Sequence, residues 1–457
     1  MMKNTISALR NFYMGLYYPL LVALLILVGH STGLDILFGG LAILSMVAGC
    51  FICTDFRFAI PVFLYTFFIV TVEHSPNVPY FSGFYLQTHI LIILAVLVAS
   101  MIVGVTCFAI RNRAQAQKPV KGGVWLGMVI FCIALACNGL FHDNYQIKNL
   151  FFAFAFFFSL LVVYFLFSTF VRFDRDAFRY FMWSLVLGGM LISLQLVYAY
   201  FTTVQFDAAG NIVKESVLIG WGIWTAIGGM LVFLMPACFY FAATERKGWI
   251  GYGLGLFEFF AIFLSQSRGA LLIGGVILLL CLLVLCFFGE YKKRNRLLTL
   301  GLVGLGAIGA LVLWRPILAL LQNFLNYGFG DNGRFEKWQK GIQNFLRRPI
   351  FGTGFYDSYV DKDWKKGVYP YFYHNTLIQF LGAGGVVGFA AYLYHRFTTV
   401  RLVLKQPNLY KTFLGICILG LLLFSLLDVL FFNTYPTIMY SLMLVFMDHA
   451  NLRDSQS

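Results

Sequence analysis

Residues 265–288 read SQSRGALLIGGVILLLCLLVLCFF, and this stretch indicates the class of fold. Beyond Arg268 it has no charged side chain, and a helix over 269–288 is long enough to cross the hydrocarbon core of a bilayer. Similar runs recur along the chain, which has 457 residues and is 60% hydrophobic and only 11% charged. A water-soluble protein of this size could not bury so much apolar surface. The sequence therefore predicts an all-α polytopic integral membrane protein.

About twelve to fourteen transmembrane helices are expected, the lower number applying if two runs are merged or re-entrant. The predicted spans are 14–31, 33–53, 57–73, 87–110, 124–141, 150–170, 180–202, 216–243, 248–265, 269–288, 297–320, 375–394, 412–432 and 434–450. Four parts follow: an N-terminal transmembrane bundle over 1–215, transmembrane helices with the SQSRGA segment over 216–320, a long external loop over 321–374, and C-terminal transmembrane helices over 375–457.

The distribution of lysine and arginine predicts the orientation in the membrane. Cytoplasmic loops are enriched in these residues. With a cytoplasmic N-terminus, 21 of the 33 cations fall on the cytoplasmic side, Arg396 and Lys411 among them, and only Lys148, Lys214 and Arg268 fall in short outer loops. Both termini are therefore expected in the cytoplasm. The net charge of +14 reflects this topology, so no nucleic-acid partner is predicted.

The remaining nine cations lie between residues 315 and 374, with five acidic residues, on the predicted outer face. An excess of positive charge outside the membrane favours an anionic ligand. Within this segment, residues 334–348 place apolar side chains at helical spacing, which is typical of an amphipathic helix lying on the outer leaflet. A lid that covers the bundle is the alternative interpretation of the same pattern.

Two short patterns resemble metal sites. Asp361-Lys362-Asp363 matches the Asp-x-Asp of metal-dependent glycosyltransferases, but neighbouring lysines neutralise it, and we interpret it as a solvated turn. Cys50-x-x-Cys53 lacks a second pair or a nearby histidine, which favours small buried residues. No metal and no cofactor is predicted.

The SQSRGA segment interrupts the apolar run at an outer boundary. Ser265 or Ser267 can cap the helix that follows, and the free N–H groups at the start of a helix attract anions. Adding Arg268 there predicts a compact phosphate site. The alternative is an arginine that extends to the membrane surface, but a lone outward arginine runs against the orientation rule.

A second candidate site begins at Tyr373 and reads YHNTLIQFLGAGGVVG to residue 388. The imidazole of His374 can accept a proton near neutral pH, and Asn375 can orient it or cap the helix. The four glycines from Gly382 to Gly388 leave one helix face bare for close packing against a helix or a lipid chain. The plainer alternative for His374 is a cap or interfacial residue.

Together these segments resemble the O-antigen ligase and O-antigen polymerase superfamily. That family carries a histidine followed by Asn, Ser or Gln, then nine residues, then a Gly-x-x-Gly/Thr/Tyr segment, as in 374–388 here. It also carries a Ser-x-Ser-Arg-Gly-Ala segment that opens a helix, as in 265–270. Its long external loop shows Gly-Arg, a Trp, then Pro-x-x-Gly-x-Gly, as in Gly333-Arg334, Trp338 and 349–354 here. The resemblance covers roughly residues 220–395.

The resemblance implies a metal-independent, inverting glycosyltransferase with a GT-C-like membrane fold. The implied donor is a glycan on undecaprenyl pyrophosphate, used at the outer face of the bacterial inner (plasma) membrane. The implied acceptor is another glycan or lipid A-core. On the family pattern Arg268 and Arg334 would bind the pyrophosphate, and His374 would act as general base on the acceptor hydroxyl.

One position departs from the family pattern. The family usually has a further external arginine before the span at 216–243, where this chain offers Lys214, a point charge without the bidentate fork of arginine. The predicted catalytic residues are His374, Arg268 and Arg334. The predicted substrate-binding residues are Lys214, Ser267, Asn375, Arg347, Arg348, Trp338 and Tyr373.

Polymerase and ligase share this chemistry and differ in acceptor, so the motifs do not separate them. The alternative class is a lipid-linked oligosaccharide flippase or another polysaccharide transporter. A transporter should carry charged residues deep within several helices. The sequence offers few of these, chiefly Glu258, with Asp428 nearer the end of a span.

Overall fold

The computed structural model describes residues 2–74, 83–117, 122–142, 145–208, 210, 212–312, 333–356 and 370–453. These residues form helices and loops, with two isolated β-bridges, Phe206–Ile212 and Leu218–Ile223, and no strand within the described ranges. The principal helices are α1 (Met2–Met14), α2 (Tyr17–Thr32), α3 (Asp35–Ile52), α4 (Ile60–Tyr65), α5 (Thr88–Arg111), α6 (Gly123–Ala136), α7 (Lys148–Phe156), α8 (Val163–Phe170), α9 (Arg175–Thr202), α10 (Trp224–Leu234), α11 (Pro236–Thr244), α12 (Trp249–Leu264), α13 (Arg268–Phe287), α14 (Lys292–Val312), α16 (Arg334–Arg347), α17 (Thr376–Leu404), α18 (Leu409–Phe424) and α19 (Thr434–Arg453). Short 3₁₀ or π segments join some of them, including the π-helix η4 (Phe157–Val162) and the 3₁₀-helix η6 (Leu430–Phe432).

Seven helical segments in the described residues are long and apolar enough to cross a membrane, or eight if the bent pair α1 and α2 forms one span. They are Asp35–Ile52, Thr88–Arg111, Lys148–Phe170, Arg175–Thr202, Trp224–Thr244, Arg268–Phe287 and Thr376–Leu404. Four shorter apolar helices coincide with further predicted spans: Phe56–Ile69, Gly123–Ala136, Trp249–Leu264 and Leu409–Phe424. The all-α polytopic membrane fold is confirmed, although fewer helices meet the length criterion than the sequence predicts.

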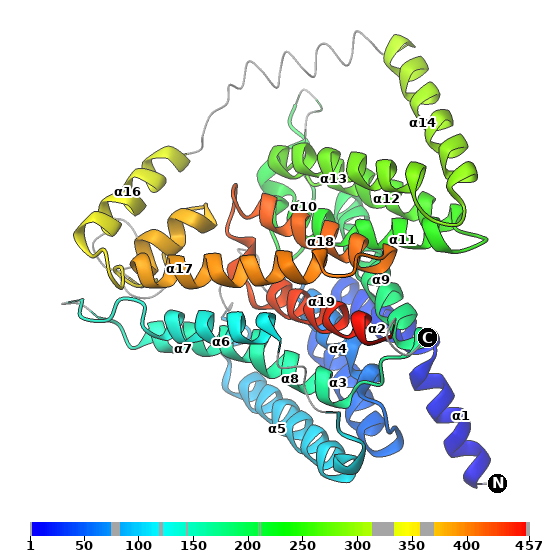
Figure 1. Ribbon diagram of the computed structural model, residues 1–457, viewed down its shortest axis with the longest axis horizontal. Helices are drawn as coiled ribbons and strands as arrows, with labels where there is room; N and C mark the ends of the chain where they lie inside the picture. Colours follow the sequence, from blue (N-terminus) through cyan, green and yellow to red (C-terminus); the bar gives the residue numbers. More distant parts are fainter. Residues whose placement is uncertain are drawn as a thin grey trace.

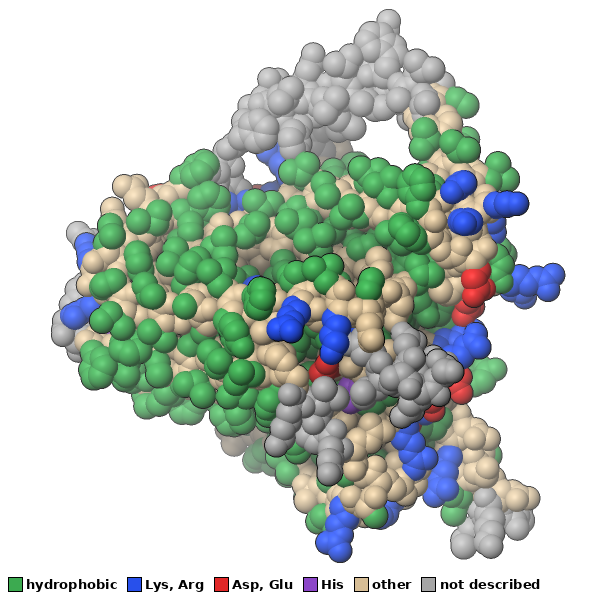
Figure 2. Space-filling model, viewed as in Figure 1, with side chains coloured by type: hydrophobic (Ala, Val, Ile, Leu, Met, Phe, Trp, Pro, Cys, Tyr) green, Lys and Arg blue, Asp and Glu red, His purple; other side chains and the backbone are tan. Residues whose placement is uncertain are grey.

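The outer surface of the bundle is apolar, as a lipid-facing surface must be. Figure 2 shows hydrophobic side chains covering much of one face of the molecule, while many lysines and arginines gather toward its margin. α5 is mostly exposed, whereas α10 and α11 are almost completely buried at the centre of the bundle. Both termini lie on the same side of the molecule, away from α16 (Figure 1).

The predicted span over 216–243 begins later than its apolar composition suggests. Residues 217–223 form a loop, and α10 begins only at Trp224. Gly220 has a left-handed backbone (φ 69°), and a Cβ atom there would clash with the backbone of Val70 and Thr71. The close contact between these two loops replaces the first turns of the expected helix.

Arg396 does not lie in a loop, as the sequence suggests, but within α17. The sequence places this residue in a cytoplasmic loop, but α17 continues to Leu404, and Arg396 is only 9% exposed within it. Lys411, assigned to the same loop, is fully buried at the start of α18 and donates from Nζ to the carbonyl of Leu402 (3.2 Å). Counting cations along the chain could not distinguish side chains that lie inside the bundle from those in a loop.

Candidate active site

His374 and Asp428 form a hydrogen-bonded pair. His374 Nδ1 lies 3.0 Å from Asp428 Oδ1, and the side chains are 31% and 14% exposed. The carboxylate can only accept, so Nδ1 carries the proton and Nε2 of the neutral ring is left as an acceptor. Burial acts to raise the pKa of Asp428, but the hydrogen bond from His374 and the positive charge that this ring carries when protonated, with the Val429 N–H and the Thr225 hydroxyl, hold that pKa below its usual value.

Sequence reasoning noted Asp428 only as an acidic residue near the end of a span. The two partners are 54 residues apart, so periodicity gave no reason to join them. The only sequence signal was an acidic residue in an apolar run, which is costly in a membrane unless it has a partner or a function.

The start of α17 holds the loop that carries Asp428. The Asn375 side chain accepts from the N–H groups of Leu377 (2.9 Å) and Ile378 (3.2 Å) and donates to the Leu426 carbonyl (3.0 Å). The Thr376 N–H adds a bond to Ser425 O (2.9 Å). Asn375, predicted as a substrate-binding residue, therefore caps α17 and holds this loop in place through its bond to Leu426.

Two candidate segments have a strained backbone. His374 has φ 53° and Gln266, inside SQSRGA, has φ 58°, a left-handed conformation that residues other than glycine rarely adopt. Such conformations persist where the surroundings enforce them, and they gather at functional sites. In both places the next residue caps a helix, so the strained residue stands directly before a helix N-terminus.

Ser267 caps α13, as the sequence predicts for this position. Its side chain accepts from the Ala270 N–H (3.4 Å) and is almost fully buried, while Arg268 beside it is exposed. A Cβ atom on Gly269 would lie 3.1 Å from Leu427 Cδ1. The start of α13 is thus packed against the residue that precedes Asp428, which brings the SQSRGA segment beside the histidine–carboxylate pair.

Two of the predicted cationic residues, Arg268 and Arg334, act electrostatically on a third, Lys214. The pKa of Lys214 is lowered by burial and then by the charges of Arg268 and Arg334, while Glu215 opposes the shift. The Lys214 ammonium also lies 5.2 Å from the centre of the Trp224 ring, at the start of α10. Both guanidinium groups are therefore close enough to Lys214 to disfavour its charge, and a bound anion would offset that effect.

The candidate residues on and near α16 separate into two groups. Arg347 lies thirteen residues beyond Arg334, about 20 Å along the helix. Arg347 and Arg348 are therefore not grouped with Lys214, Arg268 and Arg334. Trp338 lies closer to Arg334, and its indole N–H is buried without a hydrogen-bond partner in the described part of the chain.

Tyr373 is a packing residue. It is 2% exposed, its hydroxyl accepts from Asn344 Nδ2 (2.8 Å), and its ring lies against Gly341 of α16 and Gly382 of α17. Its predicted role in substrate binding does not fit this placement.

The glycines after His374 accommodate the segment 349–354. The N–H groups of Thr353 and Gly354 donate to Gly382 O (3.0 Å) and Ala383 O (2.9 Å), and those of Val386 and Val387 donate to Pro349 O (2.8 Å) and Ile350 O (3.1 Å). Two motifs of the family pattern therefore bind each other through their backbones. The expected partner of the bare face, a helix or a lipid chain, is instead this turn.

Gly385 marks a break in α17. Its backbone (φ 62°, ψ −161°) is not helical, and the two parts of α17 run in different directions (Figure 1). A Cβ atom on Gly385 would clash with the carbonyl of Ile350, whereas one on Gly384 would meet nothing within 4 Å.

Gly385→Ala is expected to destabilise the protein by about 2–4 kcal/mol, because it adds backbone strain and a steric clash. The matched control, Gly384→Ala, is expected to leave stability unchanged or slightly higher. Thermal unfolding of both variants in detergent micelles measures the difference. Equal midpoints for the two variants would show that the break at Gly385 does not require glycine.

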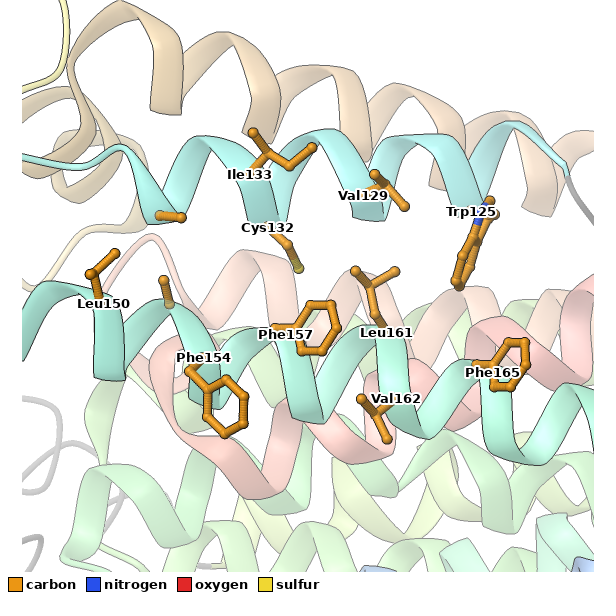
Figure 3. Close-up of a pocket in the computed structure, with 12 residues that line it drawn as sticks. Trp125, Val129, Cys132, Ile133, Leu150, Phe154, Phe157, Leu161, Val162 and Phe165 are labelled. Atoms are coloured by element: carbon orange, nitrogen blue, oxygen red, sulfur yellow. The ribbon is translucent and has the colours of Figure 1, made fainter. Parts of the chain in front are cut away.

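An apolar groove lies between α6 and the helix formed by α7, η4 and α8. It has a volume of about 790 Å³ and is lined by hydrophobic side chains, among them Trp125, Phe157 and Phe165 (Figure 3). The π-helix η4 contributes Phe157, Leu161 and Val162 to this lining. The groove has the character of a surface for lipid chains, and its lining includes none of the predicted site residues.

Within the described residues, no three His, Cys, Asp or Glu side chains are grouped as metal ligands would be. Cys50 and Cys53 are buried free thiols, as expected for small packing residues. Asp361-Lys362-Asp363 lies outside the described residues.

The fold and these residues define a polytopic membrane protein in which a histidine–carboxylate pair adjoins a group of cations. Residues 253–393 match the sequence profile of the family described as O-Antigen ligase. This segment, from α12 into α17, is therefore similar to the O-antigen ligase family, which confirms the resemblance and supports an enzymatic role in glycan assembly. The match includes Arg268, Arg334 and His374, whereas Lys214 and Asp428 lie outside it. The search of curated proteins gave no match to the chain.

Proposed function

We propose that the protein is a membrane glycosyltransferase that moves a glycan from undecaprenyl pyrophosphate to an acceptor hydroxyl. The reaction would take place on the outer face of the bacterial inner (plasma) membrane, with both termini cytoplasmic. The observation that carries the proposal is the His374–Asp428 pair, whose loop packs against the start of α13 beside Arg268. A transporter has no need of an oriented imidazole next to a cationic group.

In the proposed reaction, His374 Nε2 accepts the proton of the acceptor hydroxyl while that oxygen attacks the anomeric carbon of the donor. The bond from the anomeric carbon to the pyrophosphate oxygen breaks, and the electron pair leaves with undecaprenyl pyrophosphate. Attack from the face opposite the leaving group inverts the anomeric configuration. Asp428 holds the imidazole tautomer and stabilises the imidazolium that forms.

The cations act on the leaving group in this proposal. Negative charge grows on the pyrophosphate as the glycosidic bond breaks, and fixed positive charges stabilise that state more than the ground state. Arg268 and Arg334 would supply guanidinium forks, and Lys214 a point charge. The lowered pKa of Lys214 supports this role, because a pyrophosphate among these cations offsets their mutual repulsion. No step requires a metal ion.

A reconstituted transfer assay tests the proposal. The purified full chain in proteoliposomes is given undecaprenyl pyrophosphate carrying a labelled glycan, together with either a second lipid-linked glycan or lipid A-core. We expect release of undecaprenyl pyrophosphate and a product of inverted anomeric configuration, with a rate unchanged by EDTA. The acceptor used separates polymerase from ligase. An intact donor that only changes leaflet would favour a flippase and contradict the proposal.

A further inference from the structure

Arg396 is a buried charge without the usual partners. It lies in the second part of α17 and is 9% exposed. None of its three guanidinium nitrogens makes a hydrogen bond of good geometry, and no carboxylate pairs with it, in the part of the chain that the structure describes. A charged side chain inside a membrane bundle is costly, and such residues are usually kept for a function.

Aromatic rings surround this guanidinium instead. Its central carbon lies 4.2 Å from the ring centre of Phe431, 4.7 Å from Tyr392 and 4.9 Å from Tyr440. These rings belong to three elements, η6, α17 and α19. Ring faces attract cations, and the attraction is stronger where water is excluded. Arg396 therefore joins α17, η6 and α19 at one point.

Neighbouring contacts hold two of these rings, Tyr440 and Phe431, in position. The Tyr440 hydroxyl lies 2.9 Å from His395 Nε2 and 2.8 Å from Thr399 Oγ1, so α17 also holds the α19 ring in place. The backbone of Phe431 is held by the Thr437 hydroxyl, which donates to its carbonyl (2.9 Å). Arg396, Tyr392 and Tyr440 are thus held in place independently of Phe431, and together they fix the position of its side chain.

Phe431 follows Asp428 by three residues in the same connection between α18 and α19. Asn375 and Thr376 at the start of α17 hold the beginning of that connection, and Arg396 holds its end. One helix thus fixes the connection on both sides of Asp428. A displacement of Phe431 would move the backbone that aims the carboxylate at His374.

We propose that Arg396 is a positioning residue for the His374–Asp428 pair, acting through its cation–π contact with Phe431. The inference rests on the proposed transferase function. Arg396 does not touch the substrate in this account. Its contact with Phe431 holds η6 in place within the bundle, so that Asp428 stays within hydrogen-bond distance of the His374 imidazole.

The test uses Arg396→Met, which keeps much of the volume and removes the charge, and Arg396→Lys, which keeps a cation. In the reconstituted transfer assay we expect Arg396→Met to lower kcat about 10- to 100-fold, the usual range for residues that orient a catalytic group, with the donor KM within about twofold of wild type. Arg396→Lys should recover most of the lost rate. Arg401→Met, on an exposed part of the same helix, is the matched control and should be unaffected.

A double-mutant cycle separates positioning from general stability. If Arg396 acts through Asp428, Arg396→Met should cause little further loss in an Asp428→Asn background. An additive loss, an unchanged kcat in Arg396→Met, or failure of Arg396→Lys to restore activity would each overturn the inference. If Arg396→Met does not fold, Phe431→Leu breaks the same contact from the other side and must show the same non-additivity.

The two proposals fail in different ways. Loss of transfer in His374→Ala and Asp428→Asn, with full activity in Arg396→Met, rejects only the positioning role. Absence of transfer by the wild-type protein, or full transfer in His374→Ala, rejects the transferase function itself.

Discussion

Replacing His374 with alanine is expected to abolish glycan transfer while the protein still inserts in the membrane and binds its donor. The imidazole is the proposed base, and a positioned base contributes about 10²–10⁴-fold to rate. The cations proposed to bind the pyrophosphate lie on other segments, so donor affinity should stay within about threefold of wild type. The measurements are kcat in the reconstituted assay and donor binding to the purified variant.

The control for this prediction is His89→Ala. His89 is an exposed histidine at the start of α5, which the sequence places on the same face of the membrane. It should transfer glycan at the wild-type rate. Cells that carry His374→Ala should lack the polymer or ligated product that wild-type cells display. Surface glycan of normal amount and length in those cells would contradict the assignment of His374 as base.

Arg268→Lys is expected to lower kcat about 10²–10³-fold, the range found when one donor to a developing negative charge is removed. Lysine keeps the charge but loses the planar fork that binds two phosphate oxygens at once. Ser267 caps α13 through its own hydroxyl, so the helix start should survive the change. Single-turnover kinetics with labelled donor measures the chemical step directly.

Arg401→Lys is the control for this prediction, because Arg401 is an exposed arginine near the C-terminal end of α17, at the opposite end of that helix from His374. It should behave as wild type. If Arg268→Lys were as active as wild type, charge alone would be sufficient, and bidentate binding of the pyrophosphate would have to be abandoned. A rise in donor KM with unchanged kcat would also contradict transition-state stabilisation, since it would mean uniform binding of ground and transition states.

The sequence predicts the fold class because a bilayer leaves few choices. Long apolar runs must be helices, and these coincide with α3, α5, α9, α13 and other helices of the structure. Local chemistry was also readable: a serine three residues before Ala270 predicts a cap, and the structure has that cap. The positions of Arg268 and His374 at the starts of helices follow from the same local signals.

The remaining features depend on contacts between distant segments. Asp428 reaches His374 across 54 residues, and Gly382 and Gly385 meet the backbone of 349–354 rather than a lipid. The burial of Tyr373 depends on how α16 packs against α17. Arg396 looked like a loop cation because nothing in the local sequence shows that Phe431 and Tyr440 lie against it. Patterns along the chain report neighbours within a helix but not neighbours across the bundle.

The central claim is that the imidazole and the cations face the outer leaflet, where lipid-linked glycans would meet them. Sidedness labelling tests this claim most directly, with a membrane-impermeant maleimide on cells whose cytoplasmic membrane is intact. A cysteine is placed at Glu336, exposed on α16 two residues after Arg334, or at Lys293, exposed at the start of α14. The background is one in which the exposed Cys107 is replaced by alanine. We predict labelling of the Glu336→Cys protein in intact cells and of the Lys293→Cys protein only after lysis. The reverse pattern would place the site in the cytoplasm, out of reach of any outer-leaflet donor, and would contradict the account.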